Sequence, residues 1–107
     1  MPVAPKSIQA VAQRALDVRR ELPMSKRAGT SVGVARARDI ANGKDLSIDT
    51  LKRMKSFLAR HGGNYKKARS QGKTIKDGGV ILAYALWGGE GAIAWVDKEL
   101  RKYANSQ

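Results

Sequence analysis

Apolar residues recur along the chain at the spacing of helix faces. In the first segment they fall three or four positions apart, which places them on one side of an α-helix. These residues are Ile8, Val11, Ala12, Ala15, Leu16 and Leu22. We expect this helix to run from about residue 7 to residue 22 and to stop near Pro23. Segment 24–33 mixes Gly, Ser and Thr with two adjacent basic residues, a composition typical of a loop.

Two more helices are expected in the middle of the chain. Ser31 is a candidate N-cap for a helix that ends at residues 42–43, an Asn-Gly pair. Ser47 is a good N-cap for the next helix, and we expect the two glycines at 62–63 to end it. One side of that helix is apolar and consists of Leu51, Met54, Phe57, Leu58 and His61.

The C-terminal part is also expected to be helical. Segment 64–74 is basic and forms either a short helix over 65–70 or a loop. Residues 77–87 indicate a buried helix; a strand is the alternative, but alanines and the lack of a second convincing strand favour the helix. After a turn at glycines 88 and 89, a last helix over 91–103 is expected to place three residues inward. They are Ile93, Val96 and Leu100.

These segments predict an all-α fold, a compact bundle of about four to five short helices. A length of 107 residues fits a single domain, 1–107. Within it we distinguish an N-terminal helix and loop, 1–30, from a core over 31–107. The apolar content of 42% is sufficient for a packed interior.

The charge of the chain is strongly positive and unevenly distributed. Lys and Arg number 21 against 9 Asp and Glu, a formal net charge of +12. Such an excess is typical of proteins that meet a polyanion. From Thr50 to Lys76 the chain has no acidic residue, whereas segment 77–107 is slightly acidic. The basic side chains of 50–76 lack local ion-pair partners, so they are expected to contact water or an external anion.

This basic stretch supplies the candidate nucleic-acid-binding residues, because phosphates pair with Lys and Arg. They are Lys52, Arg53, Lys55, Arg60, Lys66, Lys67, Arg69, Lys73 and Lys76. Tyr65 lies among them and is a candidate for stacking on a base; covering the end of the preceding helix is an equal alternative. The alternative location for the site is a second basic group, made of Arg19, Arg20, Lys26 and Arg27.

Arg36 and Arg38 are further candidates for the nucleic-acid site. Two positions apart on a helix, they face different sides. We expect one of them to reach the ligand while the other pairs with Asp39 or Asp45.

The sequence offers no catalytic or metal-binding group. It has no cysteine, and His61 is the only histidine, so zinc lacks the three or four protein ligands that it needs. We expect His61 to be a packed or helix-capping residue. The carboxylates are scattered, and no glycine pair has the spacing of a phosphate-binding loop. We therefore expect no enzyme activity, no metal and no cofactor.

No targeting or membrane segment is expected either. The N-terminus lacks the apolar stretch of about 7 to 15 residues that a signal peptide requires. The longest apolar run, 80–87, is far shorter than the ~20 residues that cross a bilayer as a helix. We expect no membrane partner, and the absence of cysteine favours an intracellular or virion location.

Three motifs resemble a small domain of tailed-bacteriophage proteins, which occurs alone or attached to capsid-maturation proteases and other head-assembly proteins. They are SVGVARARDIANG at 31–43, LSIDTLKRMKSFLARH at 46–61 and LAYALWGGEGAIAW at 82–95. The shared pattern is R-A-R-D, then T-x-x-R-M-x-x-F-x-x-R-H, then L-W-G-G followed by Trp. The matching residues are Arg36, Arg38, Asp39, Thr50, Arg53, Met54, Phe57, Arg60, His61, Leu86, Trp87, Gly88, Gly89 and Trp95.

This chain departs from the phage pattern in two places. Glu90, Gly91 and Ala92 replace Asp, Ala and Gly, and the link between the second and third motifs is rich in lysine. The resemblance implies a phage origin and a binding role without catalysis. It places the chain in the host cytoplasm during infection, with the virion as the alternative.

Charge and motifs together predict a phage DNA-binding protein that contacts mainly phosphates and has low sequence specificity. It would serve replication or transcription, with DNA preferred over RNA and with a single-strand preference if Tyr65 stacks on bases. The alternatives are a structural or assembly protein of the phage head and a small regulator that binds a host enzyme such as RNA polymerase. A homo-oligomer, and a phage or host protein partner, also stay open.

Overall fold

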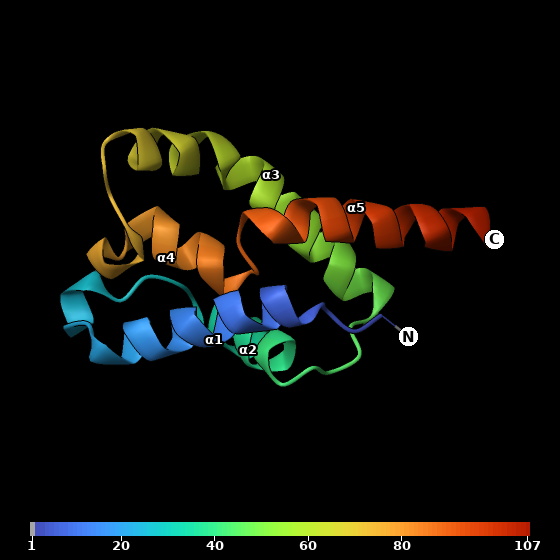
Figure 1. The fold of residues 1–107 in the computed structure, drawn as a ribbon, viewed down its shortest axis with the longest axis horizontal. Helices are drawn as coiled ribbons and strands as arrows, with labels where there is room; N and C mark the ends of the chain where they lie inside the picture. The colour runs from blue at the N-terminus through green and yellow to red at the C-terminus, as the bar shows by residue number, and fades with distance from the viewer. Residues whose placement is uncertain (1) are drawn as a thin grey trace.

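The fold of residues 2–107, which a computed structural model describes, is built from helices (Figure 1). They are α1 (Lys6–Glu21), α2 (Ser31–Ala41), α3 (Ile48–Ser70), α4 (Gly79–Leu86) and α5 (Glu90–Asn105), with 3-10 turns η1 (Met24–Lys26) and η2 (Ile75–Asp77). The Cα radius of gyration is 13.4 Å, close to the ~13 Å of a compact chain of this length. No strand occurs in this part of the chain. The predicted all-α bundle is confirmed.

Side-chain caps start two of the helices. The Ser47 hydroxyl accepts a hydrogen bond from the backbone N–H of Thr50 over 3.1 Å, as predicted. In α2 the cap is Thr30, whose hydroxyl accepts from the N–H of Gly33 over 3.2 Å. The prediction of Ser31 was wrong by one residue, because the backbone is still extended at Thr30 and already helical at Ser31.

Helix α3 continues past the two glycines that were expected to end it. The glycines at 62–63 do not take the positive φ angle that ends many helices, and α3 runs on to Ser70. Each glycine inside a helix costs about 1 kcal/mol relative to alanine. Burial of Tyr65 and Ala68 against the core offsets this cost. Segment 65–70 is helical as the end of one long helix, not as a separate short one.

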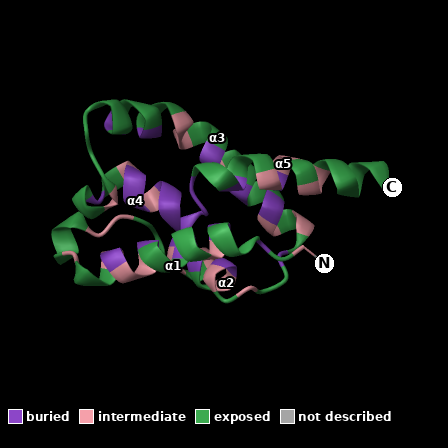
Figure 2. Cartoon of the chain, in the orientation of Figure 1, coloured by how far each residue is buried: buried purple, intermediate pink, exposed green. Residues whose placement is uncertain are grey.

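Helix α4 lies in the middle of the bundle (Figure 2). It packs against α1, α2 and α3, while α3 also packs against α5. Most of its residues are buried, namely Ile81, Leu82, Tyr84, Ala85 and Leu86. A helix that is apolar on all sides requires such a central place. The predicted buried helix is therefore confirmed.

A glycine turn separates α4 from α5. Gly88 and Gly89 have φ angles of 103° and 75°, and a Cβ on Gly88 would lie 2.7 Å from the Cβ of Ala92. The turn therefore requires glycine. The stretch Gly79–Asn105 is long and apolar enough to cross a membrane by length and composition, but half of its most apolar window is buried. The turn divides it into two helices, and packing in the core accounts for its apolar character.

The C-terminal end of helix α5 extends beyond the other helices (Figure 1). Val96 is buried and Leu100 packs against the core, as predicted. Ile93 was expected to point inward, but 41% of its surface is exposed. Ala92 is buried instead, because Gly88 approaches so closely at this point that only a small side chain fits.

Candidate nucleic-acid interface

Helix α3 has one buried face and one basic face. The buried face consists of Leu51, Met54, Leu58, Tyr65 and Ala68. On the opposite side lie Lys52, Arg53, Arg60 and Lys67, which we call the basic face; all four are exposed. The series Arg53, Arg60 and Lys67 has a spacing of about two helical turns between successive residues, or about 10.5 Å along the helix axis. Within residues 2–107 no carboxylate lies at ion-pair distance from any of the four.

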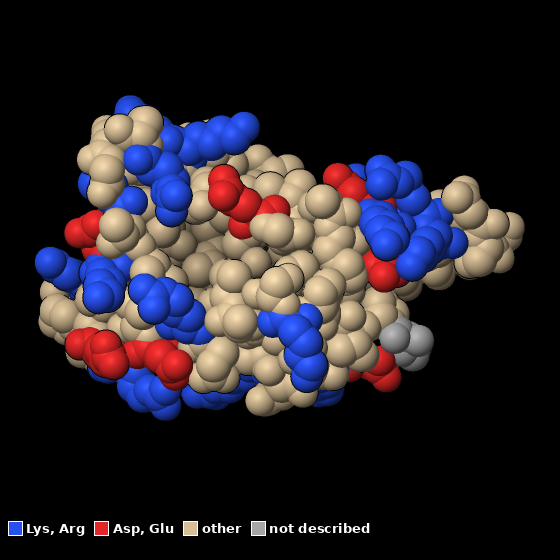
Figure 3. Space-filling model, in the orientation of Figure 1, with Lys and Arg blue, Asp and Glu red and all other residues tan. Residues whose placement is uncertain are grey.

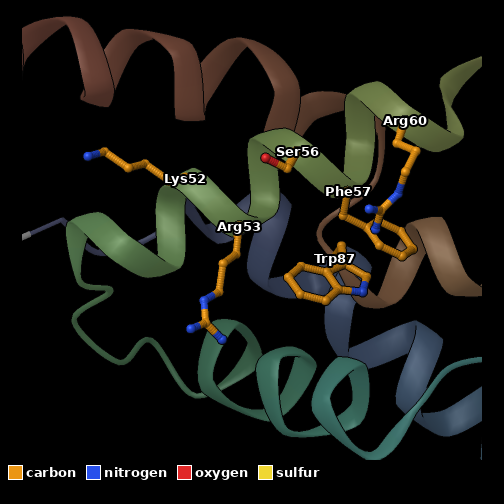
Figure 4. Close-up of a pocket in the computed structure, with 6 residues that line it drawn as sticks. All are labelled: Lys52, Arg53, Ser56, Phe57, Arg60 and Trp87. Carbon is orange, nitrogen blue, oxygen red and sulfur yellow. The ribbon is translucent and has the colours of Figure 1, made fainter.

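A hollow of about 400 Å³ opens beside the basic face (Figure 4). Its floor is aromatic, because the rings of Phe57 and Trp87 stack with centroids 4.8 Å apart and planes inclined by 15°. Lys52, Arg53 and Arg60 surround this floor. Figure 4 shows Arg60 extended beside the Phe57 ring, while Arg53 points toward α2. The hollow combines an apolar base with a cationic rim, which suits a nucleotide better than an isolated ion.

A second hollow, of about 410 Å³, shares the same two aromatic rings with the first. Its remaining walls are mostly apolar and include Val80 and Ala83. The ring of His61 lines it and lies 4.5 Å from the ring of Phe57. His61 is thus a packed residue, as predicted. In residues 2–107 no three His, Asp or Glu side chains come together as metal ligands would.

Tyr65 does not take part in this surface. Its ring stacks on Tyr84 at a centroid distance of 4.1 Å, and only 7% of the residue is exposed. Burial raises the pKa of Tyr65, and the nearby carboxylate of Glu90 raises it further. The prediction that Tyr65 stacks on a base is wrong for this conformation, because the continuation of α3 carries the ring into the core.

Two other candidate residues of α3 face away from the basic face. Lys55 points toward α5, where its Nζ lies 3.2 Å from a carboxylate oxygen of Asp97. Lys55 has no partner nearby in sequence, as expected, but the expectation that it contacts water or an external anion is wrong, because Asp97 reaches it from α5. Arg69 lines a hollow of about 470 Å³ together with Glu90 and Arg14. No carboxylate of the described chain lies at ion-pair distance from Arg69.

The remaining lysines of the basic stretch lie around the C-terminal end of α3. Lys66, Lys73 and Lys76 are exposed, and no carboxylate of the described chain lies at ion-pair distance from them. The nearest acid in sequence, Asp77, accepts a hydrogen bond from the N–H of Thr74 over 2.7 Å. In Figure 3 basic atoms gather over this end of the molecule, while the centre of the same face is largely uncharged.

Arg36 and Arg38 lie on different sides of α2, as predicted. Arg36 pairs with Asp39 at 3.3 Å, and Lys44 approaches the same carboxylate at 3.8 Å. Arg38 is exposed and faces α1, where it lines a hollow with three other arginines. Neither residue lines the aromatic hollow of α3.

The aromatic floor is the part of the site that sequence analysis missed. Trp87 was expected as the last residue of the buried helix 77–87, and its contact with Phe57 depends on how α4 packs on α3. The available signal was the spacing of Arg53, Phe57 and Arg60, which places an aromatic ring beside two cations on α3.

Comparison of the chain with protein-family models, with curated proteins and with solved structures finds no match. The resemblance to the phage domain therefore rests on the motif residues. Four of these, Arg53, Phe57, Arg60 and Trp87, line the hollow beside the basic face.

Proposed function

We propose that the chain binds nucleic acid, DNA in preference to RNA, through the basic face of α3. The observation that carries this proposal is the set of four exposed, unpaired cations on α3, three of which line an aromatic hollow. Like charges held together on one helix repel each other, and a phosphate backbone relieves that repulsion while releasing its own counterions. The site therefore favours a polyanion over a single small anion.

Low sequence specificity follows from the chemistry of the basic face. Lys and Arg contacts to phosphate position a protein on nucleic acid but carry no sequence information directly. The hollow adds a contact of another kind, because Phe57 is partly exposed and every base has a flat apolar face. This contact requires an unpaired base and supports a preference for single strands, with Phe57 in the role first assigned to Tyr65.

The motif resemblance supports a role for this binding during phage infection, in replication or transcription. The fold offers a rigid helix rather than a flexible tail for the contact, since α3 packs against both α4 and α5. The basic face is thereby held in a fixed arrangement before any ligand arrives.

The double substitution Arg53→Gln with Arg60→Gln tests the proposal. Both side chains are exposed, so folding is preserved while two cations of the basic face are lost. We expect affinity to fall about a hundredfold or more, since two charge-assisted bonds are lost and each contributes about 1.5–3 kcal/mol. The slope of log affinity against log salt should flatten by about 1.8 for duplex DNA. Fluorescence anisotropy with single-stranded and duplex oligonucleotides measures both.

The matched control is Lys98→Gln with Arg101→Gln, which removes the same charge from exposed positions of α5. A nonspecific effect of net charge would weaken both variants equally and would contradict the assignment to α3. Absence of any binding by the unmodified chain at about 50 mM salt, where phosphate contacts are strong, would overturn the proposal itself.

A further inference from the structure

A second concentration of arginine lies away from the basic face of α3. It lines a hollow of about 370 Å³ formed by α1, α2 and the residues that follow η1 and α2, and this hollow shares no residue with the aromatic hollow. The arginines are Arg19, Arg20, Arg27 and Arg38, and we call this place the arginine hollow. Its other walls come from Gln13, Leu16, Val34 and Asn42.

Two of these arginines are held in place by backbone carbonyls. The Nε of Arg19 donates to the carbonyl of Ala28 over 2.9 Å. Arg27 donates from Nε to the carbonyl of Leu22 and from Nη2 to that of Arg20, each over 2.9 Å. These bonds fix the guanidinium planes, so that little side-chain entropy remains to be lost on binding an anion.

The charges in the arginine hollow are poorly balanced. Arg20 pairs with Asp17 on the solvent side, where both side chains are largely exposed. Arg19, Arg27 and Arg38 have no carboxylate at ion-pair distance among residues 2–107. Several cations around one concave surface repel each other and attract an anion, and guanidinium groups match phosphate oxygens in geometry.

A purely structural role explains only part of this cluster. Arg27 satisfies carbonyls at the C-terminal end of α1, which is a common use of a basic residue. Arg38 belongs to another helix, and its side chain has no hydrogen bond or ion pair to the described chain, yet it lines the same hollow. Its position adds charge where charge is already in excess, which costs stability in the absence of a ligand.

We propose that the arginine hollow is a second phosphate-binding site for nucleic acid, so that one chain holds two nucleic-acid segments at once. This inference rests on the proposed function, because it assigns the same class of ligand to a separate surface. The two surfaces share no lining residue, because α3 and Trp87 line the aromatic hollow, whereas α1, α2 and Arg27 supply most of the arginine hollow. The protein would then bridge two nucleic-acid segments as well as bind along a single one.

The test is a measurement of stoichiometry and of bridging. The protein is titrated with a duplex of about 12 base pairs, which is too stiff to wrap around it because DNA persists over ~150 base pairs. In parallel, duplex fixed to beads is incubated with protein and a second, labelled duplex. We expect two duplexes per chain and capture of the labelled duplex on the beads.

Arg20→Gln with Arg38→Gln removes two charges of the arginine hollow and none of the carbonyl-bonded groups, so folding should persist. We expect this variant to bind one duplex per chain and, at protein concentrations well below saturation, to lose about nine-tenths of the captured label, as a tenfold loss of affinity at one site implies. The Lys98→Gln, Arg101→Gln control should keep both properties.

The outcomes separate this inference from the proposed function. One duplex per chain in the unmodified protein, lost on Arg53→Gln with Arg60→Gln, would keep the α3 site and overturn the second site. Unchanged capture by the Arg20, Arg38 variant would also overturn it, since bridging would then come from self-association. Loss of all binding in that variant, with its fold intact, would show a single continuous surface and contradict two sites.

Discussion

Tyr65 and Tyr84 form a buried aromatic pair between α3 and α4. Their rings stack, and the hydroxyl of Tyr84 donates to the carbonyl of Leu58 over 2.8 Å. Burial raises the pKa of both tyrosines; for Tyr84 the neighbouring Tyr65 raises it further, and Glu90 does so for each. The pair therefore stays neutral to higher pH in the folded chain than in the unfolded one.

This difference predicts a loss of stability in alkali. Below about pH 9 both states hold the phenolic protons, so the tyrosines have no effect. Above about pH 10 the unfolded chain releases protons that the folded chain retains, so the free energy of unfolding falls as pH rises toward the folded pKa values. Urea unfolding across this pH range measures the effect, with the double variant Tyr65→Phe, Tyr84→Phe as the comparison. If the free energy of unfolding fell equally steeply with pH in the double variant, the prediction would be contradicted.

At the scale of single elements, α3 offers a sharp test of where the helix ends. A Cβ on Gly63 would meet no atom within 4 Å, and its φ angle is not positive. Gly63→Ala should therefore raise the free energy of unfolding by about 0.5–1 kcal/mol, because alanine loses less entropy in a helix. Urea denaturation measures the change.

Gly72→Ala is the matched comparison, since Gly72 follows the helix with a φ angle of 80° and also has open space around it. That variant should be destabilised by backbone strain. If Gly63→Ala destabilised the chain in the same way, α3 would end at the glycine pair as its sequence alone suggests.

The two ends of α3 and the orientation of α5 show which structural features the local sequence determines and which it does not. The start of α3 was predictable, because the Ser47 cap and its partner Thr50 lie three residues apart. Its end was not, since the core contacts of Tyr65 and Ala68 outweigh two glycines. Ile93 illustrates the same limit, because the direction of α5 depends on the close approach at the preceding turn.

The same distinction between local sequence and helix packing applies to the candidate site. The excess of positive charge on α3 was predictable, because the basic stretch 50–76 contains no acidic residue. The partners of its side chains were not: Asp97 reaches Lys55 from α5, and Trp87 reaches Phe57 from the end of α4. Such pairings depend on helix packing, which neither spacing nor composition contains.

The whole molecule carries a net charge of +12, and its ion pairs occupy only some of its cations. Repulsion among the rest opposes the compact state. Sodium chloride should therefore raise the free energy of unfolding between about 0.05 and 0.5 M, because the Debye length is about 10 Å at 0.1 M and shrinks as salt rises. Urea titrations at each salt concentration measure this effect. A fall in stability with salt would show that pairs such as Lys55 with Asp97 outweigh the repulsion.

The division of α3 into a buried and a basic face also bears on how such a chain changes over generations. Under the proposed function, substitutions on the outer face alter affinity for a polyanion without touching Leu51, Met54 or Leu58 in the core. Substitutions on the inner face are limited by packing. If the basic face binds a ligand as proposed, selection is free to adjust that ligand while the fold is inherited unchanged, and lineages of this chain should diverge in what they bind sooner than in shape.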